Sequence, residues 1–263
     1  MNFLDAGEAT LLKGARNFRA VQSFRGDGGR LVRANTIYRS GELSRLDAED
    51  LQVIESLNIR LVCDLRTERE QAEFVSRWPD SHVPVRLDLP DRGTHDAGPH
   101  RLFEMIAQFP GGAGAELAMQ ALYRSKQRAY VESLAPMFDA LVAGDGLPVL
   151  IHCHAGKDRT GFIIAMLLSA VGVAYEDVVE DYVTTVKYFP VEREAKALAA
   201  WAERSFGQKI DPDSAVPLVD ARREFLAAAF EEIEKGFGGV EAYLRAAGLD
   251  DEKRERLRAL LLV

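Results

Sequence analysis

The stretch Pro148-Val149-Leu150-Ile151-His152-Cys153-His154-Ala155-Gly156-Lys157-Asp158-Arg159-Thr160-Gly161, followed by the apolar run 162–168, decides the fold of this 263-residue chain. Its first four residues form a short continuous apolar run, which is typical of a strand buried on both faces. A glycine-containing loop and a strongly apolar helix over 162–168 follow. Strand, loop and buried helix in this order are typical of half a βαβ unit. We therefore expect an α/β fold with a central, mostly parallel sheet flanked by helices.

The segments before this stretch extend the pattern. Short aliphatic and β-branched runs predict strands around 37–38 and over 60–65, and an extended segment at 83–87. Leu51, Ile54 and Leu57 have helical spacing, and Ser44 is the candidate cap of that helix. Residues 91–99 read as a loop, and the nearby His95 and His100 are expected to be ordinary surface residues.

The second half of the sequence is predicted to be largely helical. Apolar faces recur between 118 and 142, and Pro136 is expected to break or bend this run before Phe138. From Tyr175 onward every segment reads as helix. Gly238-Gly239 and Gly248 are expected to stop helices, and Asp250-Asp251 to begin the last one, where acidic side chains favour the helix dipole.

Composition indicates a globular protein, with 47% hydrophobic and 28% charged residues. No repeat or long linker divides the chain, so residues 1–263 are expected to form a single domain. The net charge of -8 disfavours broad capture of nucleic acid. The longest uncharged stretch, 160–175, is too short to span a membrane, which needs roughly 20 apolar residues.

The two cysteines, Cys63 and Cys153, suggest free thiols in a reducing compartment. The N-terminal residues lack an apolar stretch of secretory length. The expected location is therefore the cytoplasm, while export by a route without a cleaved signal stays open.

The segment 152–161, here called the cysteine loop, is where we expect the chemistry. A backbone that wraps from a strand end to a helix N-terminus directs successive N–H groups at one point, and such a nest binds phosphate oxygens. Arg159 can add two parallel donors, and the same field stabilises a thiolate at Cys153. In-line attack by Cys153 would give a phosphocysteine, which water then hydrolyses. No metal or cofactor is expected.

The individual roles follow from this arrangement. Cys153 is the expected nucleophile, and Asp158 the expected general acid and later base, with a loop-shaping role as the alternative. Thr160 is expected to donate its hydroxyl to the sulfur. The residues expected to bind the substrate phosphate are His154, Ala155, Gly156, Lys157, Asp158, Arg159 and Thr160.

Secondary candidates surround this set. Asp64 is the competing general acid, and Arg66 is either its salt-bridge partner or a second phosphate contact. Lys157 has three readings: it binds a second phosphate, holds the catalytic aspartate, or is a solvated lysine. His152 is expected to orient the loop by hydrogen bonds, and His154 points either into the site entrance or to solvent.

Two other kinds of site fit the cysteine loop poorly. A nucleotide P-loop needs glycine at position 151 and serine or threonine directly after the lysine, whereas the chain has Ile151 and Asp158. A zinc site would have to use the adjacent residues 152–154, which seldom converge on one tetrahedral ion. No metal site is therefore predicted.

The quoted residues resemble a known family. His152 to Gly161 looks like the signature of the protein tyrosine phosphatase superfamily, and its Ala-Gly-Lys-Asp-Arg-Thr-Gly form is similar to the mycobacterial protein tyrosine phosphatase B-like group of bacterial enzymes. The resemblance extends over nearly the whole chain. It includes Asn17-Phe18-Arg19, residues 27–33, Tyr38-Arg39-Ser40-Gly41-Glu42-Leu43, Asp64-Leu65-Arg66 with Glu70, and residues 239–244.

The resemblance implies a cysteine phosphatase fold with a helical C-terminal half and metal-free hydrolysis of phosphate monoesters. It also implies the nucleophile, arginine and loop-aspartate roles of Cys153, Arg159 and Asp158. Members of the group act on phosphotyrosine, often on phosphoserine or phosphothreonine, and sometimes on phosphoinositides. The chain departs from the group after Arg19, where Ala20-Val21-Gln22-Ser23 replaces an acidic residue and a glycine pair.

Two questions stay open at this level. Some relatives cover the site with a helical lid, and 182–206, broken at Pro190, is either such a lid or an ordinary packed helix pair. The expected function is that of a cysteine-dependent tyrosine phosphatase, with dual-specificity or phosphoinositide activity in addition. A phosphate-binding module without turnover is the alternative from another class, and a sulfur-transfer or arsenate-reducing enzyme, with Cys63 as its second cysteine, is a weaker third.

Overall fold

The computed structural model describes residues 12–89, 106 and 112–263. In this part of the chain a five-stranded sheet has the order β1-β2-β5-β3-β4. Its strands are β1 (Arg19–Ala20), β2 (Ile37–Ser40), β3 (Leu61–Asp64), β4 (Val85–Asp88) and β5 (Val149–His152). β2, β5, β3 and β4 run parallel, and only β1 is antiparallel, to β2. The expected α/β fold with a mostly parallel sheet is confirmed.

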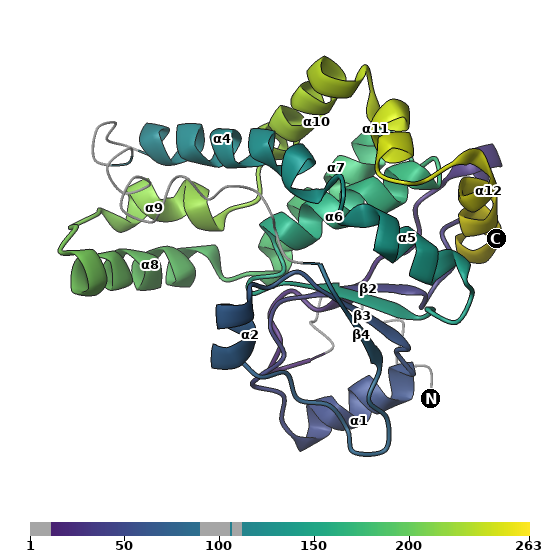
Figure 1. Cartoon of the computed structure of the whole chain (residues 1–263). Helices are drawn as coiled ribbons and strands as arrows, with labels where there is room; N and C mark the ends of the chain where they lie inside the picture. Colours follow the sequence, from purple (N-terminus) through teal and green to yellow (C-terminus); the bar gives the residue numbers. More distant parts are fainter. Residues whose placement is uncertain (1–11, 90–105, 107–111) are drawn as a thin grey trace.

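Helices cover both faces of the sheet (Figure 1). On one side lie α1 (Ala48–Leu57) and the short α2 (Glu68–Glu73). The other side carries α4 (Ala113–Tyr130), α5 (Leu134–Val142), α6 (Asp158–Ala170), α7 (Tyr175–Val183), α10 (Arg223–Phe237), α11 (Val240–Ala246) and α12 (Asp251–Leu261). In Figure 1, α4 also forms a lobe beside the sheet together with α8 (Val191–Phe206) and α9 (Pro212–Val219).

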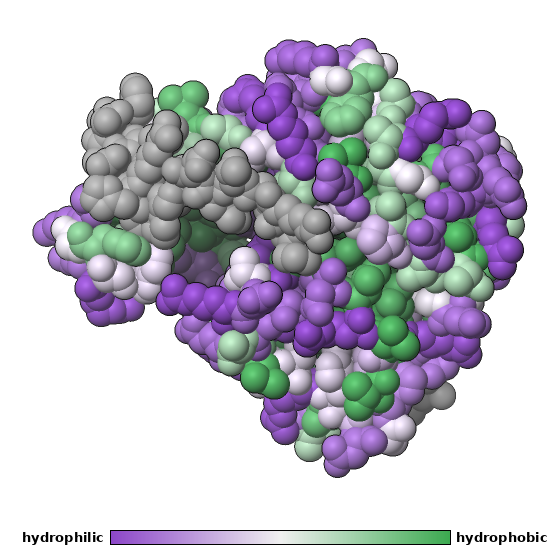
Figure 2. Space-filling view, in the orientation of Figure 1, coloured by the Kyte–Doolittle hydropathy of each residue, from purple (hydrophilic) through white to green (hydrophobic). Residues whose placement is uncertain are grey.

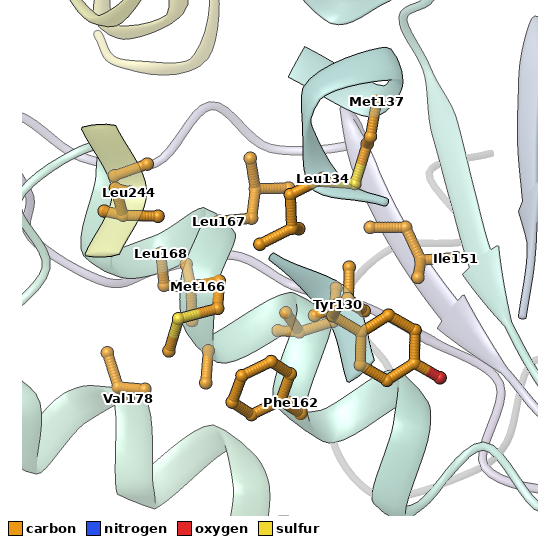
Figure 3. Packing of buried hydrophobic residues seen from close by; sticks show 14 of the residues in the cluster. Tyr130, Leu134, Met137, Ile151, Phe162, Met166, Leu167, Leu168, Val178 and Leu244 are labelled. Atoms are coloured by element: carbon orange, nitrogen blue, oxygen red, sulfur yellow. The ribbon is translucent and has the colours of Figure 1, made fainter. Parts of the chain in front are cut away.

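Alternation along the strands divides the core into two clusters, because successive side chains point to opposite faces of a sheet. Val62 and Leu150 pack on the side of α1, whereas Cys63 and Ile151 belong to the larger cluster on the other side. In that cluster α6 lies against β5 and its neighbours (Figure 3). The apolar run 162–168 is therefore buried completely, as expected of a core helix.

The structure corrects two sequence-based expectations and adds one strand that was not expected. Asp47, not Ser44, caps α1, because its side chain accepts from the Asp50 N–H and Asp50 reaches back in a capping box. Pro136 does not break the helical run: it lies in the first turn of α5, where its missing N–H would be unpaired anyway, and the break precedes it at 131–133. The two-residue β1 was not predicted, since so short a strand has no periodic pattern.

The second half agrees with the sequence. Gly238 ends α10 with a positive φ of 78°, and Gly248 follows α11 with a φ of 87°. Asp250 caps α12 through the Lys253 N–H at 2.8 Å. The loop predicted at 91–99, with His95 and His100, lies outside the described residues.

The segment 182–206, predicted to be either a helical lid or an ordinary packed helix pair, does not form one unit of either kind. Tyr182 belongs to the end of α7 and is buried in the core, and a 3-10 helix at Thr184–Tyr188 follows it. Only α8, which begins directly after Pro190, projects into the lobe, and its packing partner is α9. None of the described helices is long and apolar enough to cross a membrane.

Candidate active site

The cysteine loop leaves β5 at its carboxyl end and runs into the N-terminus of α6. Cys153 is 2% exposed, and the Gly156 N–H donates to its Sγ at 3.2 Å. The free N–H groups of the first turn of α6 and the helix dipole place positive potential on this side of the loop. The geometry favours an anion in front of the loop.

Gly156 allows the loop to pack against the end of β2. Its φ of +71° is in the left-handed region, and a Cβ there would lie 2.5 Å from the backbone of Ser40 and Gly41. Nearby, the Glu42 N–H donates to the His154 carbonyl at 2.9 Å. Only glycine fits at position 156 without moving one of the two chain segments.

Arg159 presents a free edge. Its Nη1 and Nη2 donate to the two carboxylate oxygens of Glu70 at 2.6 and 2.7 Å, and Nη1 also donates to the Leu65 carbonyl at 3.2 Å. A guanidinium has five N–H donors. Within the described residues this leaves Nε–H and the second Nη2–H, which lie on one edge and match two phosphate oxygens.

Glu70 fixes the orientation of that edge. Although burial opposes ionisation, the hydrogen bonds and charge of Arg159 lower the pKa of Glu70 to about 2. Burial likewise disfavours the charged form of Arg159, but the pKa of its guanidinium is raised by the negative charges at Cys153 and Glu70. The arginine is therefore held in place before any substrate arrives.

Asp158 and Lys157 join the loop to a chain of polar contacts, in which the Lys157 side chain is 2% exposed and the Asp158 side chain 22%. Asp158 Oδ1 accepts from the Tyr123 hydroxyl at 2.7 Å and from Lys157 Nζ at 2.8 Å. Lys157 Nζ also donates to the Asp220 carbonyl at 2.9 Å, and the hydroxyls of Tyr123 and Tyr182 are 2.7 Å apart. Burial raises the pKa of Asp158, but the charges of Lys157 and Lys126 outweigh it and lower the pKa below its ordinary value. Of the three readings of Lys157, the contacts support the one that holds the aspartate.

A cavity of about 1090 Å³ opens in front of the loop, and neither Cys153 nor Arg159 is among the residues that line it. The loop contributes His154, Ala155, Lys157 and Asp158, and α8 contributes Arg193, Glu194, Ala197, Leu198 and Trp201. Arg16, on the opposite wall, donates to Glu194 at 2.7 Å. α8 is thus a wall of the cavity, and Figure 2 shows the molecule hollowed beside the lobe that carries it.

The secondary candidates lie elsewhere. Arg66 donates to both carboxylate oxygens of Asp64, at 2.9 and 2.8 Å, and each residue is 1% exposed. With His152 they line a separate cavity of about 350 Å³ and do not line the one in front of the loop. Burial lowers the pKa of His152 to about 4, and neither ring nitrogen has a hydrogen-bond partner in the described part of the chain. Its Nε2 lies 3.6 Å from Asp64 Oδ2, and its role in orienting the loop stays a prediction.

Two further expectations are resolved by contacts. The Thr160 hydroxyl is buried without a hydrogen-bond partner among the described residues, so the predicted bond to the Cys153 sulfur is absent, and the Gly156 N–H takes that place. His154 lines the cavity and packs edge-on against Phe74, with ring centroids 4.7 Å apart.

Several contributors to the site were not predicted as such. They are Tyr123, Tyr182, Asp220 and Arg16, and the partners Glu70, Asn17, Arg39 and Asp181 of the loop. Asn17, Arg39 and Glu70 fall within blocks that carry the family resemblance, which was the available signal. Tyr123 and Asp181 lie on amphipathic helices, where a buried polar residue has no distinguishing spacing.

Fold and loop together define a class of enzyme, the cysteine-dependent phosphatases, which need no metal ion. The model of the tyrosine phosphatase family matches residues 10–263, and the chain belongs to that family. It is therefore a metal-independent tyrosine phosphatase by family.

The sequence similarity to known tyrosine phosphatases extends over most of each chain. The chain is 32% identical to the triple specificity protein phosphatase PtpB of Mycobacterium tuberculosis, over 95% of this chain and 98% of that one. It is 28% identical to a tyrosine-protein phosphatase of Nostoc commune, over 88% of this chain and 75% of the relative. A crystal structure of P. aeruginosa TpbA covers 93% of this chain and is itself covered to 91%, at 19% identity and a TM-score of 0.25. The family assignment rests on sequence and not on that superposition.

Proposed function

We propose that the protein hydrolyses phosphate monoesters through a phosphocysteine at Cys153. The observation that carries this proposal is the Nε–Nη2 edge of Arg159, which no described residue occupies and which Glu70 holds beside a buried cysteine at a helix N-terminus. An arginine edge and loop amides match the equatorial oxygens of a phosphoryl group. They need no metal ion to do so.

In the first step the Cys153 thiolate attacks phosphorus, the ester P–O bond breaks, and the leaving oxygen takes a proton from Asp158. In the second step Asp158 accepts a proton from water, which attacks phosphorus and releases inorganic phosphate and the thiolate. Asp158 is preferred over Asp64 because it lines the cavity in front of the loop, while Asp64 is buried in an ion pair away from it.

We assign phosphotyrosine as the main substrate group, with phosphoserine, phosphothreonine or phosphoinositides as further substrates. A cavity of about 1090 Å³ has room for an aromatic ester or an inositol ring. The named relative with triple specificity supports a broad range. The first assay compares para-nitrophenyl phosphate, a phosphotyrosine peptide and phosphatidylinositol phosphates with chelator present. No turnover of any of them by the folded protein would favour a phosphate-binding module.

Asp158→Asn should separate substrates by leaving group. We expect turnover of a phosphotyrosine or alkyl phosphate to fall by about 10²- to 10⁴-fold, the usual contribution of general acid catalysis. Release of very good leaving groups in the first turnover should fall far less, because they depart without a proton. The measurement is the single-turnover rate of leaving-group release against leaving-group pKa for wild type and variant.

Asp64→Asn is the matched control for that experiment. It leaves Arg66 with a weaker partner in a buried site, so we expect a lower melting temperature and an unchanged dependence on the leaving group. A leaving-group effect confined to Asp64→Asn would make Asp64 the acid.

Tyr123→Phe should move the pH profile. The tyrosine hydroxyl donates to the ionised carboxylate of Asp158, so its removal raises the pKa of Asp158. A general acid is active when protonated, and the descending limb of kcat should therefore shift to higher pH. Tyr182→Phe, which keeps the bond between Tyr123 and Asp158, should shift the limb less. A profile unchanged in Tyr123→Phe would show that Asp158 does not set this limb.

A further inference from the structure

The carbonyl oxygen of Gly156 accepts two buried hydrogen bonds from outside the cysteine loop. Asn17 Nδ2 donates at 2.5 Å and Arg39 Nη2 at 2.9 Å. Both side chains are 0% exposed, and neither lines the cavity in front of the loop. The mechanism described above assigns them no role.

An ionic cluster behind the loop holds these donors. Arg39 Nη1 is 2.5 Å from Asp181 Oδ2, and Arg19 Nη2 donates to the Asp181 carbonyl at 2.8 Å. Arg19 also bonds Asn17 Oδ1, and Thr185 Oγ1 lies 3.5 Å from both guanidinium groups. Strand β2, the segment around β1, and α7 with the 3-10 helix after it thus converge on one loop carbonyl.

The charges of the cluster do not cancel. Burial raises the pKa of Asp181, but Arg39 and Arg19 outweigh this effect and lower it, so the carboxylate is ionised at neutral pH. Burial, together with Arg39, lowers the pKa of Arg19 to about 10, at which it still carries its charge at neutral pH. Two guanidinium groups and one carboxylate leave one net positive charge buried behind the loop. Burying unbalanced charge is costly, so a cluster of this kind calls for a compensating use.

Fixing one carbonyl also fixes the next N–H. The peptide unit is planar and trans, so the C=O of Gly156 and the N–H of Lys157 point in opposite directions. With the carbonyl drawn toward Asn17 and Arg39, the Lys157 N–H is directed away from them. The Gly156 N–H is already committed to Cys153 Sγ at 3.2 Å. The orientation of the Lys157 amide therefore depends on Asn17 and Arg39, next to an amide that already donates to the nucleophile.

We propose that Asn17 and Arg39, anchored by Asp181, are positioning residues that preset the cysteine loop for the phosphoryl group and for the thiolate. They act through the Gly156 peptide and touch neither substrate nor reacting atoms. The proposal rests on the assigned function of the loop. It implies that the sequence segments around Asn17 and Arg39, which carry the family resemblance, contribute to catalysis.

Arg39→Lys tests the proposal while keeping the buried charge. A lysine at this position has one ammonium and cannot hold both Asp181 and the Gly156 carbonyl in the planar geometry of a guanidinium. We expect kcat for para-nitrophenyl phosphate to fall by about 10- to 100-fold, as for the loss of a hydrogen-bond partner that orients a metal ligand. Competitive inhibition by inorganic phosphate should weaken about tenfold, and the ultraviolet absorbance of the thiolate at neutral pH should decrease.

Asn17→Gly is the second variant, and it leaves the Arg39–Asp181 pair intact. Asn17 has a φ of 56°, a conformation that glycine adopts without strain, so this variant carries the test if Arg39→Lys does not fold. It should weaken phosphate inhibition in the same direction. Arg254→Lys is the matched control, since it changes another buried arginine, paired with Glu241 away from the loop.

The readouts separate positioning from general stability. Weaker phosphate binding and less thiolate in Arg39→Lys or Asn17→Gly, at a melting temperature no lower than that of Arg254→Lys, would support the proposal. Unchanged kcat, phosphate inhibition and thiolate absorbance in a folded variant would overturn it. The assigned function is tested separately, by comparing turnover of the wild type with that of Cys153→Ser. A folded wild type without turnover would refute the assigned function, and phosphate binding by the variants would still test how Asn17 and Arg39 position the loop.

Discussion

Cys153→Ser is expected to lose turnover of every phosphate ester by at least about a thousandfold, because a serine hydroxyl at this position has no adjacent base to activate it. The loop amides and the free edge of Arg159 remain in this variant. It should therefore still bind phosphotyrosine and inorganic phosphate. The measurement is kcat by stopped assay, together with binding of a phosphotyrosine peptide by calorimetry.

Cys63→Ser is the control for this prediction. Cys63 lies on β3 in the core, and burial raises the pKa of its thiol to about 12, so it is not a thiolate at neutral pH. Its replacement should lower stability and leave kcat unchanged. Loss of turnover in Cys63→Ser at full folding would instead support a redox mechanism that uses both cysteines.

Arg159→Lys is expected to lower kcat/KM by about 10²- to 10³-fold, the usual cost of one lost donor to a transition-state oxyanion. The charge is kept, but an ammonium cannot bind both oxygens of Glu70 and two phosphate oxygens at once. If geometry and not charge is what Arg159 supplies, the loss should appear mainly in kcat.

Arg16→Lys provides the matched change at an arginine that lines the cavity but lies outside the loop. Arg16 pairs with Glu194 and is not part of the loop, so its conversion to lysine should change kcat/KM by less than about tenfold. Equal effects of the two substitutions would show that Arg159 contributes only general positive charge.

The fold was accessible from the sequence wherever one local pattern was sufficient. The buried run 148–151 and the apolar helix after it define the parallel sheet, and the glycine stops at Gly238 and Gly248 define helix ends. The errors occurred where two local signals compete. Ser44 and Asp47 are both good caps, and each has an aspartate three residues ahead, so local sequence does not decide between them; in the structure Asp47 and Asp50 form the capping box. Pro136 was assigned a break because a proline in a first turn cannot be distinguished from one that ends a run.

The site was accessible only in its contiguous part. Cys153, Asp158 and Arg159 share one loop, and their spacing in the sequence is enough to predict that they act at one site. Glu70 and Arg39 reach the loop from other strands and helices, and their contacts depend on sheet order, which the sequence does not reveal. Lys157 shows the same limit, because its partner Asp220 is 63 residues away.

The phosphocysteine itself is the most direct test of the account. Asp158→Asn mixed with excess para-nitrophenyl phosphate, denatured at once and analysed by mass spectrometry should carry one added phosphoryl group, located on the peptide that contains Cys153. That variant should accumulate the intermediate, since it lacks the base that activates water. A protein that turns over substrate with no phosphoryl group on Cys153, or with the group on another residue, would contradict the mechanism.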